Sequence, residues 1–195
     1  MSGLFVDSIK DASNTKTLAT LSSSSVTLHS DVVFPAGGTG NPISVAIVHE
    51  QQASSDGGDL NSGSWHKRGL NTIISDIDSI VTVDTTNKQF TIGAGSYFFQ
   101  FGAIGYKVGH HQTKLYNATD SVDAGMGILA YGNTSYNQAQ TSMGFAFQQP
   151  SGSIIYELQH RSAESQSSNG RGPSSSWGSG SSPNVYSFVV IYKLK

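Results

Sequence analysis

The sequence contains two adjacent histidines, His110 and His111, whose side chains are of a type that binds transition metals. Neighbouring residues on a β-strand point to opposite faces, so one metal ion cannot take both without a turn. The chain has no cysteine to complete a zinc site. The remaining histidines show no ligand spacing: His29, His49, His66 and His160. We therefore predict no metal and no cofactor, and we interpret these residues as solvent-exposed or hydrogen-bonded loop histidines.

Two acidic stretches offer oxygen ligands for calcium, Asp56-Gly57-Gly58-Asp59 and Asp76-Ile77-Asp78. Neither contains the closing bidentate glutamate of a complete calcium loop, so we interpret them as a turn and a strand edge. Glu157 and Glu164 are isolated and do not suggest a glycosidase pair. The sequence has no nucleophile elbow, phosphate-binding Gly-Lys motif or His-Glu-x-x-His motif. We predict that the protein is not an enzyme.

Both tryptophans, Trp65 and Trp177, lie among serines and glycines. Exposed aromatic side chains stack on sugar rings and also anchor protein interfaces. For Trp65 we favour packing at a domain or subunit boundary. For Trp177, which lies in a Ser- and Gly-rich stretch from residue 163 to 183, glycan recognition and docking are both open.

The composition narrows the class of protein. Only 12% of the 195 residues are charged, and the formal net charge is −2 with scattered Lys and Arg. A typical soluble domain has about 25% charged residues, and duplex binding needs a basic patch, so we expect no nucleic-acid partner. No stretch approaches the ~20 apolar residues that cross a bilayer, and no signal peptide is recognisable. We expect a protein that is made in a cytoplasm and does not insert into a membrane.

The first 42 residues differ from the rest, and we assign residues 1–42 to an attachment and trimerisation segment with its linker. Short apolar clusters alternate there with turn formers, which predicts strands of about five residues. Such a segment has too few apolar side chains to offset its ordering entropy, so it should be ordered only against another chain. The residues expected to dock are Leu4, Phe5, Val6 and Ile9.

From residue 43 to 195 we expect one all-β head domain. No segment shows apolar spacing of three and four, so no helix longer than a turn is predicted. Strand-like runs recur at the spacing of a β-sandwich. They are 44–52, 70–75, 80–84, 89–93, 96–107, 113–117, 124–130, 141–148, 154–160 and 185–193.

Alternation along the strands predicts which side chains face the core. Tyr97, Phe99 and Phe101 share one side of their strand, and together with Phe90 they are the core candidates. The last strand is apolar on both sides and must be covered twice. A neighbouring subunit is the simplest second cover. The predicted interface residues are Tyr186, Phe188, Val190 and Tyr192.

Two stretches resemble the C1q family. Residues 87–101 are similar to its pattern of an F-T strand, a glycine turn and G-x-Y-x-F, and residues 186–192 resemble its closing strand. Further short matches resemble C-terminal domains of particle proteins from phages that infect marine bacteria, and the opening residues resemble starts of small phage fibre proteins. These matches are residues 63–72, 109–117, 154–160 and 4–10.

The resemblance implies a ten-stranded C1q/TNF-like jelly roll that forms a homotrimer. It also implies a structural component of a bacteriophage particle: a trimeric fibre or decoration protein, anchored to a capsid or tail protein by its N-terminal segment, with the heads outward. The alternative is an adhesin that binds a host glycan through residues 163–183, and a third reading is a polysaccharide depolymerase. Location on head or tail, and a calcium ion at the trimer axis, stay open.

Overall fold

The structure is a computed structural model that describes residues 8–10, 17–21, 26–28, 43–175 and 183–194. The chain divides into two compact units, residues 1–41 and 42–195. All regular structure in the described residues is β, and none of it is a helix long and apolar enough to cross a membrane. The two units are therefore described as two separate β structures.

The first unit is a small antiparallel sheet with the strand order β1-β2-β3. Its strands are β1 (Ser8–Lys10), β2 (Thr17–Leu21) and β3 (Val26–Leu28). Among the residues expected to dock, Ile9 lies in β1 opposite Ala19, and the register shifts directly after it. Leu4, Phe5 and Val6 lie outside the described residues.

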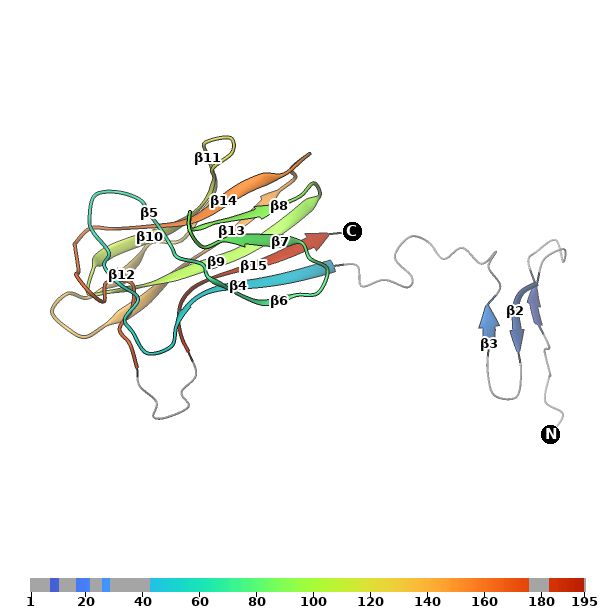
Figure 1. The fold of residues 1–195 in the computed structure, drawn as a ribbon, viewed down its shortest axis with the longest axis horizontal. Coiled ribbons are helices and arrows are strands. Elements are labelled where there is room, and N and C mark those ends of the chain that lie inside the picture. Colours follow the sequence, from blue (N-terminus) through green and yellow to red (C-terminus); the bar gives the residue numbers. More distant parts are fainter. Residues whose placement is uncertain (1–7, 11–16, 22–25, 29–42, 176–182, 195) are drawn as a thin grey trace. The chain divides into compact units, whose positions relative to one another are not determined.

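The second unit, the head, consists of two antiparallel sheets (Figure 1). The seven-stranded sheet has the order β11-β10-β14-β8-β7, with β12 paired to β10 and β5 paired to β14. Its strands are β5 (His66–Lys67), β7 (Val81–Asp84), β8 (Gln89–Ile92), β10 (Gly109–Asn117), β11 (Val122–Met126), β12 (Ala130–Gly132) and β14 (Ile154–Ser162).

The five-stranded sheet has the order β13-β9-β15-β4-β6. Its strands are β4 (Ile43–Gln52), β6 (Thr72–Asp76), β9 (Ser96–Tyr106), β13 (Ala139–Gln148) and β15 (Asn184–Leu194). Each of the ten runs predicted from the sequence therefore has a counterpart, but the run 124–130 is divided between β11 and β12. It divides because the amide of Gly127 donates to the Thr113 carbonyl (2.9 Å) and that of Ile128 to the Met143 carbonyl (2.7 Å), on two different strands.

An aromatic cluster fills the space between the two sheets. The four core candidates, Phe90, Tyr97, Phe99 and Phe101, are each 0% exposed. Tyr156 of β14 joins them, with its ring centroid 5.7 Å from that of Phe90 and 5.4 Å from that of Phe99. Full burial of such a side chain stabilises a fold by about 1.5–3 kcal/mol relative to exposure, so this cluster joins the two sheets strongly.

Strands β4 and β15 define two ends of the head. Ile43 pairs with Leu194 at one end, and Gln52 pairs with Asn184 at the other. We call the first the terminal end, because the chain enters and leaves the head there (Figure 1). We call the second the loop end, because the connections from residue 53 to 65 and from 163 to 175 lie there.

Candidate functional site

The outer side of the five-stranded sheet carries a continuous apolar surface, which we call the apolar face. Phe145 and Phe147 of β13 are 57% and 53% exposed. Phe98 of β9 stacks on Phe145 with a centroid distance of 5.8 Å and lies 6.0 Å from the Tyr192 ring of β15. Members of the apolar face from β4, β9, β13 and β15 include Ile43, Phe98, Phe145, Phe147, Phe188, Val190, Tyr192 and Leu194.

The apolar face lies opposite the core because the strands of this sheet carry apolar residues at both their inward and their outward positions. In β15 the inward positions are Val189 and Ile191, which are 0% exposed, and the positions between them face outward. Five members of the apolar face, at the terminal end, line a hollow of about 430 Å³: Ile43, Phe98, Phe147, Tyr192 and Leu194. Contiguous exposed apolar surface of this kind marks an interaction site in water-soluble domains.

Tyr186 does not belong to this face, contrary to the expectation from simple alternation. The register between β15 and β4 shifts between Val185 and Ser187, which is a β-bulge that turns the Tyr186 side chain away from the row of Phe188 and Val190. Tyr186 is only 2% exposed, and its hydroxyl donates to the Ser55 carbonyl at 2.7 Å. Loops of its own chain cover it, so it is not available to a neighbouring copy.

A second exposed apolar surface follows the edge of the head beside β13, and we call it the edge patch. It comprises the end of β11, the connection to β12, and β12 itself. Ile128 and Leu129 are 67% and 62% exposed, and Met126 and Tyr131 are 46% and 42% exposed. Strand alternation did not reveal these residues, because Ile128 and Leu129 lie between the two strands.

A buried ion pair lies toward the loop end, between Glu50 of β4 and Arg68, which follows β5. The Arg68 Nε atom donates to Glu50 Oε2 at 2.6 Å, and both side chains are almost fully buried. The Ser187 hydroxyl (2.8 Å) and the Gly69 amide (3.0 Å) also donate to this carboxylate. Burial raises the pKa of Glu50, but Arg68 and these hydrogen bonds outweigh it and hold the pKa below its usual value. Glu50 is therefore an ionised carboxylate whose charge is balanced by Arg68 and whose two oxygens both accept hydrogen bonds inside the fold.

The ion pair continues into two buried histidines. Arg68 Nη1 lies 3.3 Å from His160 Nδ1, and His160 Nε2 lies 2.9 Å from His111 Nδ1. A guanidinium only donates, so His160 Nδ1 accepts and its Nε2–H donates to His111 Nδ1. Desolvation, together with the charge of Arg68, lowers the pKa of His111 to about 4 and the pKa of His160 well below its usual value. Both imidazoles are neutral at pH 7.

Arg68 also fixes the loops at this end of the head. Its Nη2 donates to the carbonyls of Arg171 (3.2 Å) and Tyr186 (3.1 Å). Arg171 in turn donates from Nε to the Asp59 carbonyl (2.7 Å) and from Nη1 to the Lys67 carbonyl (3.0 Å). One buried arginine thereby connects the loop near residue 59 with the start of β15.

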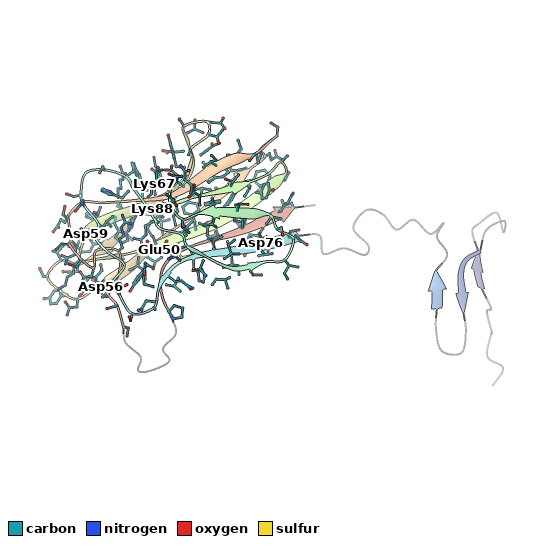
Figure 2. The ribbon with its side chains drawn as sticks, viewed as in Figure 1. Glu50, Asp56, Asp59, Lys67, Asp76 and Lys88 are labelled. Atoms are coloured by element: carbon teal, nitrogen blue, oxygen red, sulfur yellow. The ribbon has the colours of Figure 1, made fainter. Side chains whose placement is uncertain are left out.

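Three of the acidic residues considered as calcium ligands accept hydrogen bonds from backbone amides of their own chain. Asp56 accepts from the amide of Ser174 (2.5 Å) and Asp59 from the amide of Ser168 (2.6 Å). Asp76 accepts from the amides of Ile80 and Val81, at 2.8 and 3.1 Å. Figure 2 shows Asp56 and Asp59 toward the loop end and Asp76 nearer the other end. The described part of the chain contains no group of three or more His, Asp or Glu arranged for a metal ion.

The two tryptophans have different outcomes. Trp65 is partly buried against the outer side of the seven-stranded sheet, where the Lys114 ammonium lies 4.6 Å and the Arg161 guanidinium 4.7 Å from its ring centroid. Cations over an indole ring attract its π electrons. It therefore packs on its own head. Trp177 lies outside the described residues.

No protein-family profile and no curated protein matches the chain. Solved structures match its fold. The crystal structure of murine APRIL at pH 5.0 has a TM-score of 0.50 at 7% identity, covering 78% of this chain and 99% of that chain. Eiger TNF from S. frugiperda has a TM-score of 0.50 at 12% identity, covering 80% and 94%. The globular domain of zebrafish complement 1qA has a TM-score of 0.41 at 14% identity, covering 78% and 95%. The head therefore has an all-β jelly-roll fold like that of the APRIL and Eiger TNF structures.

Proposed function

We propose that the protein is a trimeric structural component of a bacteriophage particle, a fibre or decoration protein. Residues 1–42 would attach it to a capsid or tail protein, and the heads would point outward. The observation that carries the assembly is the apolar face: Phe145 and Phe147 are more than half exposed, and Phe145 stacks on Phe98, which in turn lies against Tyr192. The phage assignment rests on the sequence resemblance and on the low charge content.

Two different apolar surfaces favour a closed ring over a two-fold dimer. A two-fold contact uses one patch twice, whereas a head-to-tail contact joins two unlike patches and closes when the rotation allows it. The apolar face and the edge patch are such an unlike pair; β13 belongs to the apolar face, and the edge patch lies beside it. The Met126 and Ile128 side of the edge patch, beside β13, would cover the apolar face of the next copy, with three copies completing the ring. Leu129 and Tyr131 would lie outside this contact.

The direction of the head follows from where the chain enters it. Ile43 is at the terminal end, next to Leu194. The segment that attaches the head to the particle therefore joins it there, and the loop end is the far end of β4 and β15. Exposed loops at a free end, held by Arg68 and Arg171, suit contact with the surroundings of a particle.

The test of this proposal has two parts. Light scattering on the purified full chain should give three times the 20.6 kDa mass of one chain. Labelled antibodies against the head should decorate particles in electron micrographs, at the capsid or at the tail. A monomer at micromolar concentration would contradict the assembly, and particles without label would contradict the location.

A second candidate function is binding of a host-surface glycan by the loop end. The observation that favours it is the hydrogen bonding of the described loop residues at that end. The Asp56 carboxylate accepts a hydrogen bond from the amide of Ser174. The Asn184 side chain accepts from the Ser175 amide at 3.2 Å and donates to the Ser175 carbonyl at 3.3 Å. Three heads on one particle protein would add avidity of 10²–10⁴ over a single contact. A glycan array with the full chain tests this function separately from its mass.

A further inference from the structure

We infer that a cavity of about 300 Å³ at the loop end of the seven-stranded sheet binds one acidic sugar unit, with the sugar carboxylate on Arg161. The cavity is lined by Gly63, His110, His111, Gln112, Leu129, Arg161, Ser162 and Ala163. This inference supplies a ligand class for the second candidate function and rests on it. It moves the expected sugar contact away from Trp177 to the described surface of the head.

Arg161 is exposed on β14 and has no carboxylate partner among the described residues. The ion pairs among the described residues involve Lys67, Arg68, Lys114 and Arg171, and none of them involves Arg161. Its guanidinium has five N–H donors, of which Nη2 donates to Gln112 Oε1 at 2.9 Å. The other donors lack a carboxylate partner within the described part of the chain, although a carboxylate is the acceptor that a guanidinium fits best.

The Arg161 side chain is already oriented by Trp65 and Gln112. Its guanidinium lies 4.7 Å from the centre of the Trp65 ring. Gln112, which accepts from it, is itself fixed because its Nε2 donates to the Gly127 carbonyl at 2.8 Å. A cation held from two sides loses little conformational freedom when a ligand arrives, so the binding free energy is not spent on ordering it.

The remaining walls suit a sugar ring. The exposed His110 ring lies 4.9 Å from the Tyr131 ring and can exchange hydrogen bonds with hydroxyl groups. Leu129, 62% exposed, and Ala163 offer apolar surface to C–H groups. About 300 Å³ is the lower limit for small-molecule cavities, which fits one ring. An aspartate or glutamate side chain of a peptide would supply the carboxylate but would leave His110 and Leu129 without partners.

The experiment measures binding of three acidic monosaccharides, glucuronate, galacturonate and N-acetylneuraminate, to the full chain by saturation-transfer NMR and calorimetry. Neutral glucose and galactose serve as matched ligands that lack the carboxylate. We expect at least one acidic sugar to bind at least tenfold more tightly than the neutral sugars. Arg161→Gln should weaken that binding at least tenfold, and His110→Ala should weaken it severalfold.

Lys193→Gln is the matched control variant, because it removes a positive charge from β15 of the other sheet. It should bind the acidic sugar as the unaltered chain does. The inference is overturned if no acidic sugar binds, if neutral sugars bind equally well, or if Arg161→Gln binds normally. Equal competition by a Glu-rich peptide would assign the cavity to acidic peptides instead. A glycan array signal that Arg161→Gln retains would leave the second candidate function standing while removing this site from it.

Discussion

His111 and His160 share a buried hydrogen bond of 2.9 Å, between Nδ1 of the first and Nε2 of the second. The donor direction is set by Arg68 at the other side of His160, so His111 is left with an Nε2–H that has no partner among the described residues. The ring of His111 lies directly on the backbone of Gly105. The charge of Glu50, the tautomers of the two histidines and the packing on Gly105 are thereby linked through one series of hydrogen bonds that begins at Glu50.

Removing the Glu50 carboxylate should lower the free energy of unfolding, because Arg68 would then be a buried charge without a counter-charge beside it. In Glu50→Gln, Arg68 loses its compensating charge inside the fold, and we expect a loss of about 3–5 kcal/mol in the free energy of unfolding. Urea unfolding measures it. The matched control is Asp123→Asn, which breaks the Lys114 pair at a carboxylate side chain that is 47% exposed and should cost at most about 1 kcal/mol. Equal losses for the two variants would show that burial of the Glu50 pair has no special weight.

The histidine pair should make the fold sensitive to mild acid. Because the folded pKa of His111 is about 4 against 6.5 in the unfolded chain, the unfolded state binds more protons between these values. Stability is therefore complete above pH 6.5 and falls as the pH drops toward 4, by about 1.4 kcal/mol per pH unit for each histidine. His160 shifts in the same direction. Urea unfolding at pH 7, 6 and 5 measures the slope.

Two substitutions separate the buried pair from the other titrating groups. His111→Gln should reduce the pH slope between 7 and 5, because only one of the two histidines still gains a proton on unfolding. Thr82→Ser, a change without a titrating group at an exposed position, should leave the slope unchanged. The Glu50 carboxylate titrates below this range, since its pKa lies under the usual 4.5. A slope that His111→Gln does not alter would rule out the pair as its source.

A single methyl group at Gly105 should disturb the same region. A Cβ atom there would lie 2.8 Å from three atoms of the His111 ring, closer than real Cβ contacts. The ring cannot move aside without breaking its hydrogen bond to His160, so we expect Gly105→Ala to cost about 1–3 kcal/mol, as overpacking of a core does. Thermal unfolding measures the loss. Gly93→Ala, where nothing lies within 4 Å of the added atom, is the control.

Charges on the apolar face should dissociate the assembly without unfolding the head. Phe145→Asp combined with Phe147→Asp alters two side chains that are more than half exposed in one chain. Burying their charges between copies would be strongly unfavourable, so light scattering should report a monomer. Thr82→Asp, at an exposed position of the other sheet, should remain a trimer. An unchanged trimer in the double variant would place the interface elsewhere.

The strands were predictable because the period of two is a local property of the sequence. In β4, the inward positions Ala46 and Val48 alternate with partly exposed ones, and the same rule located Phe99 and Phe101. The bulge beside Tyr186 was not predictable, because it depends on pairing with β4, far away in the sequence. The division of 124–130 likewise depends on acceptors in other strands.

The buried polar chain could have been suspected but not assembled. Glu50 follows Ala46 and Val48 at an inward position, and His160 follows Tyr156 and Leu158 in the same way. A charged or imidazole side chain in an apolar register signals a buried polar partner. The partners are 18 and 92 residues away from Arg68, so only the folded arrangement identifies them.

The pairing of Ile43 with Leu194 gives the head a practical polarity. A passenger protein fused behind the last strand would emerge beside Ile43, where the N-terminal residues join the head; under the proposed function this is the side toward the particle. The opposite end, where Arg68 fastens the loops, would remain unobstructed. Enzymes or fluorescent labels could thus be attached at the terminal end without masking the loop end of the head.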